Sequence, residues 1–293
     1  MRTTTKIISI FIGMAAYAVS SSGLAQALEK NWESAAELKG PESALYDSGR
    51  DVIYVSNVNG DANAVDGNGF ISKVALDGSI VELEWVTGLN APKGLAMAGD
   101  MLYVSDINTL VEIALDSGEI SNRYEAADAK FLNDVAVDAA GNVYVSDMVA
   151  NAIYRLQDGN FGLWIQDDQL ENPNGLFVDG EQMIIGSWGK MTDGFSTEVP
   201  GHLKSVSLAD GSIQSLGDGT PAGNLDGVES DGNGNYYVTD WMNGKLLLID
   251  TSGNVTELLV LGQGSADLGV IPDQGLLLIP MMMNNTLHAY TVK

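Results

Sequence analysis

The chain has no cysteine among its 293 residues. This absence excludes a disulfide framework, a thiol nucleophile and a zinc site held by thiolates. It also excludes a lipid anchor on a cysteine that follows a signal segment. A chain of this length buries a large core without covalent cross-links, so a stable fold is expected all the same.

Basic residues are scarce: 14 Lys and Arg stand against 39 Asp and Glu, which gives a net charge of −25. Such a chain repels the phosphates of nucleic acids and anionic membranes, and it attracts cations. We therefore expect no nucleic-acid partner, and the partner that we do expect is a small-molecule substrate. Adaptation to a salty environment explains the acidity equally well.

A long apolar run occurs near the N-terminus, at residues 7–19. Arg2 and Lys6 precede it, and the small-residue motif Ala25-Gln26-Ala27 follows it. This order predicts a signal peptide over residues 1–27 that is cleaved after Ala27, so that the mature protein is exported to the periplasm or secreted. An uncleaved membrane anchor is the alternative. After cleavage we expect no membrane partner, because no later segment resembles a membrane span.

Proline is rare and glycine abundant, at 7 and 34 residues, and the chain repeats. Similar segments recur at intervals of about 40 to 52 residues, a period that is typical of a propeller or a solenoid. Their first residues are Glu42, Lys93, Asn133, Asn174, Asp226 and Asp267.

Each repeat is expected to form β-strands. Segments such as Tyr144-Val145-Ser146-Asp147 favour a half-buried strand, and turns such as Asp158-Gly159 favour hairpins. Six repeats of four strands predict an all-β fold, a six-bladed β-propeller with four-stranded antiparallel blades. The last repeat has only three strands. We expect an N-terminal strand, at about residues 31–38, to close the ring of a single domain over residues 28–293.

The residues that begin the repeats predict a metal site. In a propeller, the first strand of each blade lines the central channel, so these residues should meet at one mouth. Four of them carry oxygen ligands: Glu42, Asn133, Asn174 and Asp226. Two carboxylates and two amide carbonyls suit Ca²⁺ better than Mg²⁺ or Zn²⁺. The alternative is that Asn and Asp cap turns where strands begin.

The motifs Pro41-Glu42-Ser43, Leu132-Asn133-Asp134, Pro173-Asn174-Gly175 and Leu225-Asp226-Gly227 resemble those of the senescence marker protein/gluconolactonase family, which is related to the paraoxonases and diisopropyl fluorophosphatase. With the strand pattern, the similarity covers about residues 40–293. It implies that the four positions hold a catalytic calcium and that the protein hydrolyses lactones, esters or phosphoesters. We expect Asp226 to act as general base or nucleophile, with Asn133 beside it at the metal.

The chain departs from that family's pattern in two respects. Paraoxonase-like members carry a histidine dyad near the metal, whereas the two histidines here, His202 and His288, lie outside the motifs. Gluconolactonase-type members have an arginine where this chain has Phe131. The resemblance therefore implies a substrate that is more hydrophobic than a sugar lactone.

Lys93 begins the second repeat and is the positively charged residue among those that begin the repeats. As a third catalytic residue, it would bind a substrate anion or an oxyanion. A desolvated lysine can also act as a general base or form a Schiff base. The alternative is a channel lysine that pairs with Glu42 or Asp134.

An apolar substrate pocket is predicted from the residues that follow the second strands, together with Phe131. These residues are Met148, Trp188, Trp241 and Met281, with Met282 and Met283 following Met281. A wall of this kind binds hydrophobic ligands, whereas the alternative is that the side chains pack between neighbouring blades.

The first and fourth repeats are longer than the others, by extra residues at 58–69 and 189–202. These loops are candidate lids over the pocket. The first also contains Asp61, Asn63, Asp66 and Asn68, a minor candidate for a second cation, because the spacing is not that of an EF-hand.

Two functions are compatible with this sequence. The first is a calcium-dependent hydrolase that acts on a lactone or an ester. The second is a non-catalytic exported propeller that binds a ligand or a protein partner, with calcium as a structural ion.

Overall fold

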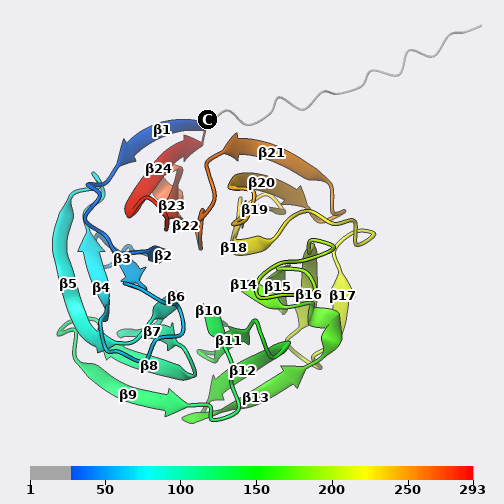
Figure 1. Ribbon diagram of the computed structural model, residues 1–293, viewed down its shortest axis with the longest axis horizontal. Coiled ribbons are helices and arrows are strands. Elements are labelled where there is room, and N and C mark those ends of the chain that lie inside the picture. The colour runs from blue at the N-terminus through cyan, green and yellow to red at the C-terminus, as the bar shows by residue number, and fades with distance from the viewer. Residues whose placement is uncertain (1–27, 293) are drawn as a thin grey trace, which may run out of the picture.

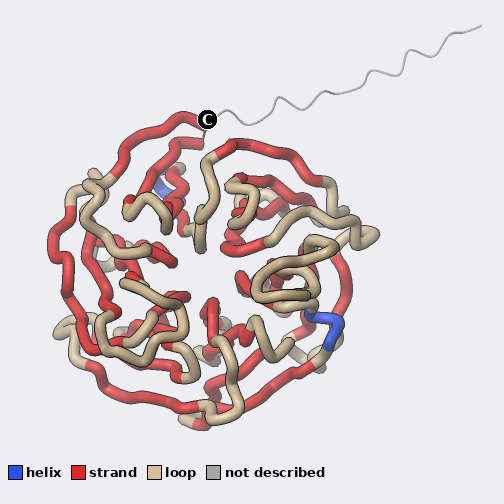
Figure 2. The backbone as a smooth tube through the Cα atoms, in the orientation of Figure 1, coloured by secondary structure: helices blue, strands red, loops and turns tan. Residues whose placement is uncertain are grey.

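The computed structural model describes residues 28–292, so the predicted signal peptide lies outside the described residues. Six four-stranded antiparallel sheets surround a central channel, and each sheet forms one blade (Figure 1). In blades one to five the chain proceeds from the channel to the rim, and loops join the successive strands (Figure 2). The predicted six-bladed β-propeller is confirmed.

The strands follow the repeats in order. Blade one contains β2 (Pro41–Asp47), β3 (Val52–Asn57), β4 (Gly69–Val74) and β5 (Ile80–Leu89). Blade two contains β6 (Pro92–Ala98), β7 (Met101–Asp106), β8 (Thr109–Ala114) and β9 (Ile120–Glu125). Blade three contains β10 (Leu132–Val137), β11 (Val143–Asp147), β12 (Ala152–Gln157) and β13 (Asn160–Gln166).

The other three blades repeat this plan. Blade four contains β14 (Pro173–Asp179), β15 (Gln182–Ser187), β16 (Leu203–Ser207) and β17 (Ile213–Ser215). Blade five contains β18 (Leu225–Ser230), β19 (Asn235–Asp240), β20 (Lys245–Asp250) and β21 (Val255–Val260). Blade six contains β22 (Gly269–Ile271), β23 (Leu276–Met281), β24 (Thr286–Val292) and β1 (Leu28–Glu33). Two short 3-10 helices, η1 (Asp168–Leu170) and η2 (Pro272–Gln274), lie in connections.

The N-terminal strand closes the ring. β1 pairs with β24 along the rim of blade six, and the pairing begins between Leu28 and Val292. The strand therefore lies a few residues earlier than predicted. After Glu33 the chain turns toward blade one, and Ser34 fixes this turn by exchanging hydrogen bonds with the backbone of Leu287. Closure leaves β24 with partners on both sides, so that blade six has four strands like the other blades.

The hydrophobic core is divided among the contacts between neighbouring blades. Tyr54 and Ile71 of blade one, for example, pack with Leu102 and Val104 of blade two. Comparable clusters join each blade to the next around the ring. Because each blade packs against two others, the inner strands are held in a fixed circle. In the part of the chain that the structure describes, no helix is long and apolar enough to cross a membrane.

Candidate metal centre and pocket

The residues that begin the repeats lie in irregularities of the inner strands. The pairing of inner and second strands shifts register near the start of blades one to five. A bulge of this kind turns a side chain away from the regular alternation of a strand. The residues inside the shifts include Glu42, Lys93, Asn133, Asn174 and Asp226.

Hydroxyl groups of the second strands hold these bulges. The backbone N–H of Asp134 donates to the Ser146 hydroxyl at 2.9 Å, and that of Gly227 donates to Thr239 at 2.9 Å. The acidic residue that follows the hydroxyl holds the preceding loop: Asp147 accepts from the backbone N–H of Phe131 at 3.1 Å. The repeated Ser-Asp pattern, which indicated only strands in the sequence, thus positions the site residues.

Glycine follows three of these residues because neighbouring inner strands approach closely. A Cβ at Gly175 would overlap the carbonyl oxygen of Asp226 in the next blade. A Cβ at Gly94 would lie 2.5 Å from the Cα of Asp134, again in the next blade. The channel wall is therefore set by contacts between backbones, and an added methyl group would displace a site residue.

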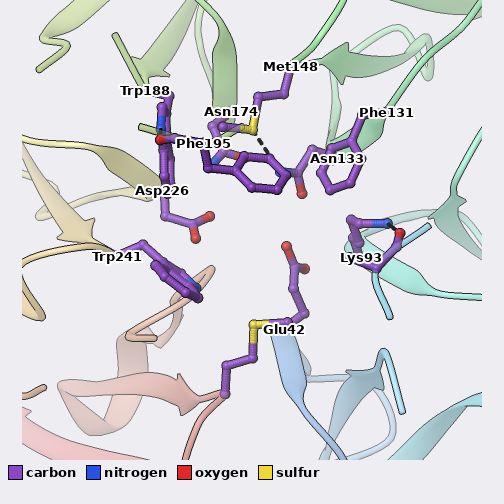
Figure 3. A pocket seen from close by; sticks show the side chains of 12 residues that line it. Glu42, Lys93, Phe131, Asn133, Met148, Asn174, Trp188, Phe195, Asp226 and Trp241 are labelled. Atoms are coloured by element: carbon purple, nitrogen blue, oxygen red, sulfur yellow. Dashed lines mark hydrogen bonds between the residues drawn. The ribbon is translucent and has the colours of Figure 1, made fainter. Parts of the chain in front are cut away.

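A pocket of about 140 Å³ lies at this mouth of the channel. Its volume is close to that of a cavity that holds a benzene ring, about 150 Å³. The four predicted metal ligands and Lys93 lie in its wall with Phe131, Met148, Trp188 and Trp241 (Figure 3). Ala62 and Phe195, from the two long loops, complete the wall with Met282.

The apolar wall is a packed cluster. Phe131, Met148 and Trp188 are buried against one another, and Trp241 lies beside them, with the ring centroids of Trp188 and Trp241 6.1 Å apart. The Phe195 ring contacts both Phe131 and Trp188, at centroid distances of 5.6 and 6.2 Å. These side chains therefore pack against one another and also line the pocket, so the two alternatives from the sequence both apply. Phe195 was missed because nothing in its loop sequence marks which residue turns inward.

The prediction for Met281 is wrong. Met281 is the last residue of β23, and its side chain is buried in the core between blades five and six with Tyr237 and Leu246. Met282, the next residue, lines the pocket instead. Successive side chains along a strand point to opposite sides, so an error of one residue moves the side chain from the pocket to the core.

The four predicted metal ligands converge in the pocket. The carboxylates of Glu42 and Asp226 point toward each other and toward the amide of Asn133 (Figure 3). Glu42, Asn133, Asn174 and Asp226 are each 5% exposed or less. One oxygen each of Glu42, Asn133 and Asn174 is buried without a hydrogen-bond partner. A buried oxygen without a partner lowers the stability of the folded protein, unless a partner such as a cation is present.

The electrostatics of the pocket favour a cation. Burial, followed by the charges of Asp226 and Asp267, raises the pKa of Glu42 well above its ordinary value. Burial, followed by the charge of Asp267, raises the pKa of Asp226 likewise. Among residues 28–292, no three His, Asp or Glu side chains gather to hold a metal by themselves. A cation here would therefore depend on the amide oxygens, an all-oxygen set that fits Ca²⁺.

A second layer of acids lies behind the ligands. Asp267 accepts a hydrogen bond from the Ser43 hydroxyl at 2.5 Å, and burial raises the pKa of Asp267 to about 7. Asp134 accepts from the backbone N–H groups of Val135 and Leu176, at 2.6 Å each, and so joins blades three and four. Burial and the charge of Asp267 raise the pKa of Asp134 well above its ordinary value.

Lys93 is buried and joins three blades. Its Nζ donates to the carbonyl oxygens of Ala62 and Ala91, at 3.0 Å each, and lies 4.4 Å from the centre of the Phe131 ring. Within the described residues it forms no hydrogen-bonded ion pair with Glu42 or Asp134, the alternative that the sequence left open. Burial lowers the pKa of Lys93 to about 8, against the opposing effect of Glu42.

The other candidates lie outside the pocket. The Nε2 of His202 is 2.8 Å from the Ser215 hydroxyl, and the Nε2 of His288 is 3.1 Å from the Thr286 hydroxyl, and neither histidine lines the pocket. Asp61 and Asp66 accept hydrogen bonds from the nearby backbone N–H groups of Asn63 and Asn68, and all four residues belong to the exposed loop. They stabilise turns, and nothing indicates a second cation there.

Solved structures of low sequence identity share the fold. A gluconolactonase from Xanthomonas campestris matches with a TM-score of 0.64 at 14% identity, over 92% of this chain and 92% of the other. A streptogramin B lyase matches with 0.63 at 13% identity, over 91% and 97%. A catalytically inactive histidine-to-alanine variant of virginiamycin B lyase from Staphylococcus aureus, with quinupristin, matches with 0.58 at 14%, over 91% and 99%. These identities show the propeller alone.

The sequence comparison is more specific. No curated protein sequence matches the chain. The sequence profile of the SMP-30/gluconolactonase/LRE-like region, however, matches residues 41–265, which include all four predicted metal ligands and most of the pocket wall. The chain therefore belongs to the SMP-30/gluconolactonase/LRE-like family.

Proposed function

We propose that the protein is a calcium-dependent hydrolase of lactones or esters that are more hydrophobic than sugar lactones. The observation that carries the proposal is the set of unpartnered buried oxygens on Glu42, Asn133 and Asn174, at a single pocket beside the Asp226 carboxylate. Unpartnered buried oxygens are rare in folded proteins, and three at one place support the proposal of a bound cation as their partner.

A divalent cation held by these residues would polarise an ester carbonyl and stabilise the oxyanion that forms during hydrolysis. Asp226 is the group we assign to general base or nucleophile, because its carboxylate faces the open pocket beside the other ligands (Figure 3). Asn133 would be one of the oxygen ligands and would lie beside the carbonyl group of the bound substrate. Burial of all four side chains keeps water from weakening these interactions.

Lys93 is proposed to assist from the opposite wall. An ammonium has three N–H donors, and two of those of Lys93 go to the carbonyl oxygens of Ala62 and Ala91. The third is available to an oxygen of the substrate. The two carbonyl partners favour the charged ammonium, so we assign Lys93 to oxyanion or carboxylate binding and not to Schiff-base chemistry.

The pocket wall supports a hydrophobic substrate. Phe131, Trp188, Phe195 and Trp241 form an aromatic wall, and no arginine among residues 28–292 lines the pocket. Such a surface binds apolar groups and offers little to the hydroxyl groups of a sugar. The small volume suits the reacting end of a substrate, such as a lactone ring.

The lining of the pocket favours hydrolysis over the lyase reaction of two structural neighbours. In one of them, loss of a histidine accompanies loss of catalysis. No histidine lines the pocket of this chain. Hydrolysis at a cation would need oxygen ligands and a base, the roles that we assign to Glu42, Asn133, Asn174 and Asp226.

The test is a screen of purified protein against aliphatic lactones, aryl esters and phosphotriesters, with calcium and with a chelator. We expect turnover of an apolar lactone or ester that the chelator abolishes and added calcium restores. A preference for gluconolactone would contradict the substrate assignment. Calcium binding without turnover of any substrate would favour the non-catalytic propeller.

A further inference from the structure

A short hairpin carries Phe195 into the wall of the pocket. The hairpin lies in the long loop of blade four, and Met191 and Thr197 pair at its base in an antiparallel bridge. The indole N–H of Trp188 donates to the carbonyl oxygen of Phe195 at 2.8 Å. The tip of the hairpin is therefore held by a residue of the pocket wall.

Two buried asparagines hold the ends of the hairpin. The side-chain oxygen of Asn172 accepts from the backbone N–H of Met191 at 3.0 Å, and the side-chain nitrogen of Asn224 donates to the Thr197 hydroxyl at 2.9 Å. Asn172 and Asn224 are 5% and 6% exposed. Each precedes a proposed metal ligand by two residues, at the same place in blades four and five. The hairpin is thus fixed to the starts of two inner strands that carry the ligand set.

Phe195 lies at the boundary between the pocket and solvent. Of the ten large hydrophobic residues that are exposed among residues 28–292, Phe195 alone lines the pocket, and it is 41% exposed. Its ring packs against Phe131 and Trp188, which are 5% and 4% exposed (Figure 3). Phe195 therefore separates the buried rings of the wall from solvent on one side.

The pocket is small, with a volume of about 140 Å³. A ring of about six atoms fills such a space and leaves little room for a long chain. We propose that Phe195 is a specificity-determining residue that limits the substrate to a small ring or acyl group with a short chain, and that Asn172 and Asn224 hold it in place. The assignment of this limit to lactones or esters rests on the proposed function, whereas the size limit itself does not.

The test measures the binding of 2-alkylcyclopentanones, which share the ring and the carbonyl group of a lactone but have no bond to hydrolyse. Trp188 and Trp241 line the pocket, so tryptophan fluorescence reports the binding of each ketone. In the wild type, we expect the affinity to stop rising once the chain is longer than about two carbons. In Phe195→Ala, each further methylene group should strengthen binding about fourfold, so the hexyl ketone should bind at least about tenfold more tightly than to the wild type.

Two further variants separate the role of Phe195 from a general effect of mutation. Phe161→Ala is the matched control, because the Phe161 ring also packs against two aromatic rings, at centroid distances of 5.7 and 6.4 Å, but does not line the pocket. It should keep the dependence on chain length of the wild type. Thr197→Val keeps the size of the side chain and removes the hydroxyl that binds Asn224. We expect it to strengthen binding of the hexyl ketone by about two- to fivefold, because the hairpin loses one anchor.

The size limit is refuted if the wild type binds the hexyl ketone as tightly as Phe195→Ala does, or if it binds no ketone at all. An equal change in Phe161→Ala would also overturn it. An unchanged profile in Thr197→Val would remove the anchoring role of Asn224. A shifted ketone profile in Phe195→Ala without turnover of any lactone or ester would refute the proposed hydrolase alone. Turnover of γ-lactones with the same dependence on chain length in wild type and Phe195→Ala would refute the size limit alone.

Discussion

Asp226 differs from the other three proposed ligands because its carboxylate has a partner. A hydrogen bond from Asn174 lowers the pKa of Asp226, against the larger opposite effects of burial and of Asp267. Asn174 therefore holds Asp226 while its own amide oxygen remains unpartnered. Because Asn174 fixes the position of the Asp226 carboxylate, a mutation that removes only the charge of Asp226 tests how much that charge contributes to cation binding.

Replacement of Asp226 by Asn should weaken calcium binding at least about a hundredfold, because the side chain keeps its size and loses a charged ligand. Isothermal titration calorimetry on chelator-treated protein measures the change. Asp61→Asn is the control, since this acid lies in the exposed loop and holds only a local turn. Equal isotherms for wild type and Asp226→Asn would refute the metal site.

Lys93 offers a second test at the scale of one residue. Lys93→Met keeps the apolar stem and removes the ammonium that binds two carbonyl oxygens. We expect kcat/KM to fall by roughly thirtyfold, about 2 kcal/mol, if the ammonium stabilises the oxyanion. The same loss on substrates with and without a carboxylate would support the oxyanion role. Unchanged kinetics with a lower Tm would leave Lys93 a purely structural link between blades.

The acids of the channel predict how stability depends on pH. The raised pKa values of Glu42, Asp134 and Asp226, and the value of about 7 for Asp267, mean that the folded metal-free protein binds more protons than the unfolded chain. Stability without calcium should therefore fall as pH rises from about 5 to about 7. Thermal unfolding with chelator measures this, and calcium should raise Tm most at the upper end. A Tm that rises with pH in chelator would contradict the prediction.

At the scale of the strand, the bulges and glycines of the inner strands fix the ligand geometry. Gly175→Ala would push a methyl group into the Asp226 carbonyl, so we expect a loss of about 1–3 kcal/mol in stability and weaker calcium binding. Gly162→Ala in β13 is the control, because an added Cβ there meets nothing within 4 Å. Differential scanning calorimetry and calcium titration of the two variants separate the local clash from a general effect of alanine.

The sequence predicted the elements better than it predicted the pocket. Repeats such as Tyr144-Val145-Ser146-Asp147 mark strands because burial and turn chemistry are local properties. The direction of a side chain beyond a strand end depends on one residue of register, which is why Met281 was expected where Met282 lies. Phe195 reaches the pocket through the fold of a loop, held in part by the bond from Trp188 Nε1 to its carbonyl oxygen. The packing of Phe195 against side chains of other segments produces no periodic pattern in the sequence.

At the scale of the whole molecule, the residue that follows the predicted cleavage site already belongs to the propeller. Leu28, the first residue after the predicted cleavage site, is also the first residue of β1 and pairs with Val292. We expect mass spectrometry of exported protein to give an N-terminus at Leu28. An intact Met1 in the membrane fraction would favour the uncleaved anchor.

The pairing of β1 with β24 also has a consequence for how the protein folds. The strands that complete blade six come from opposite ends of the chain, so their contact has nearly the largest sequence separation that the molecule allows. Contacts of this kind form late, because a long loop must close before they contribute. We therefore expect blades one to five to form before the circle is complete, and we expect a slow closure as the last step. A peptide that matches residues 28–33 should compete with that step during refolding and trap an open, calcium-free ring.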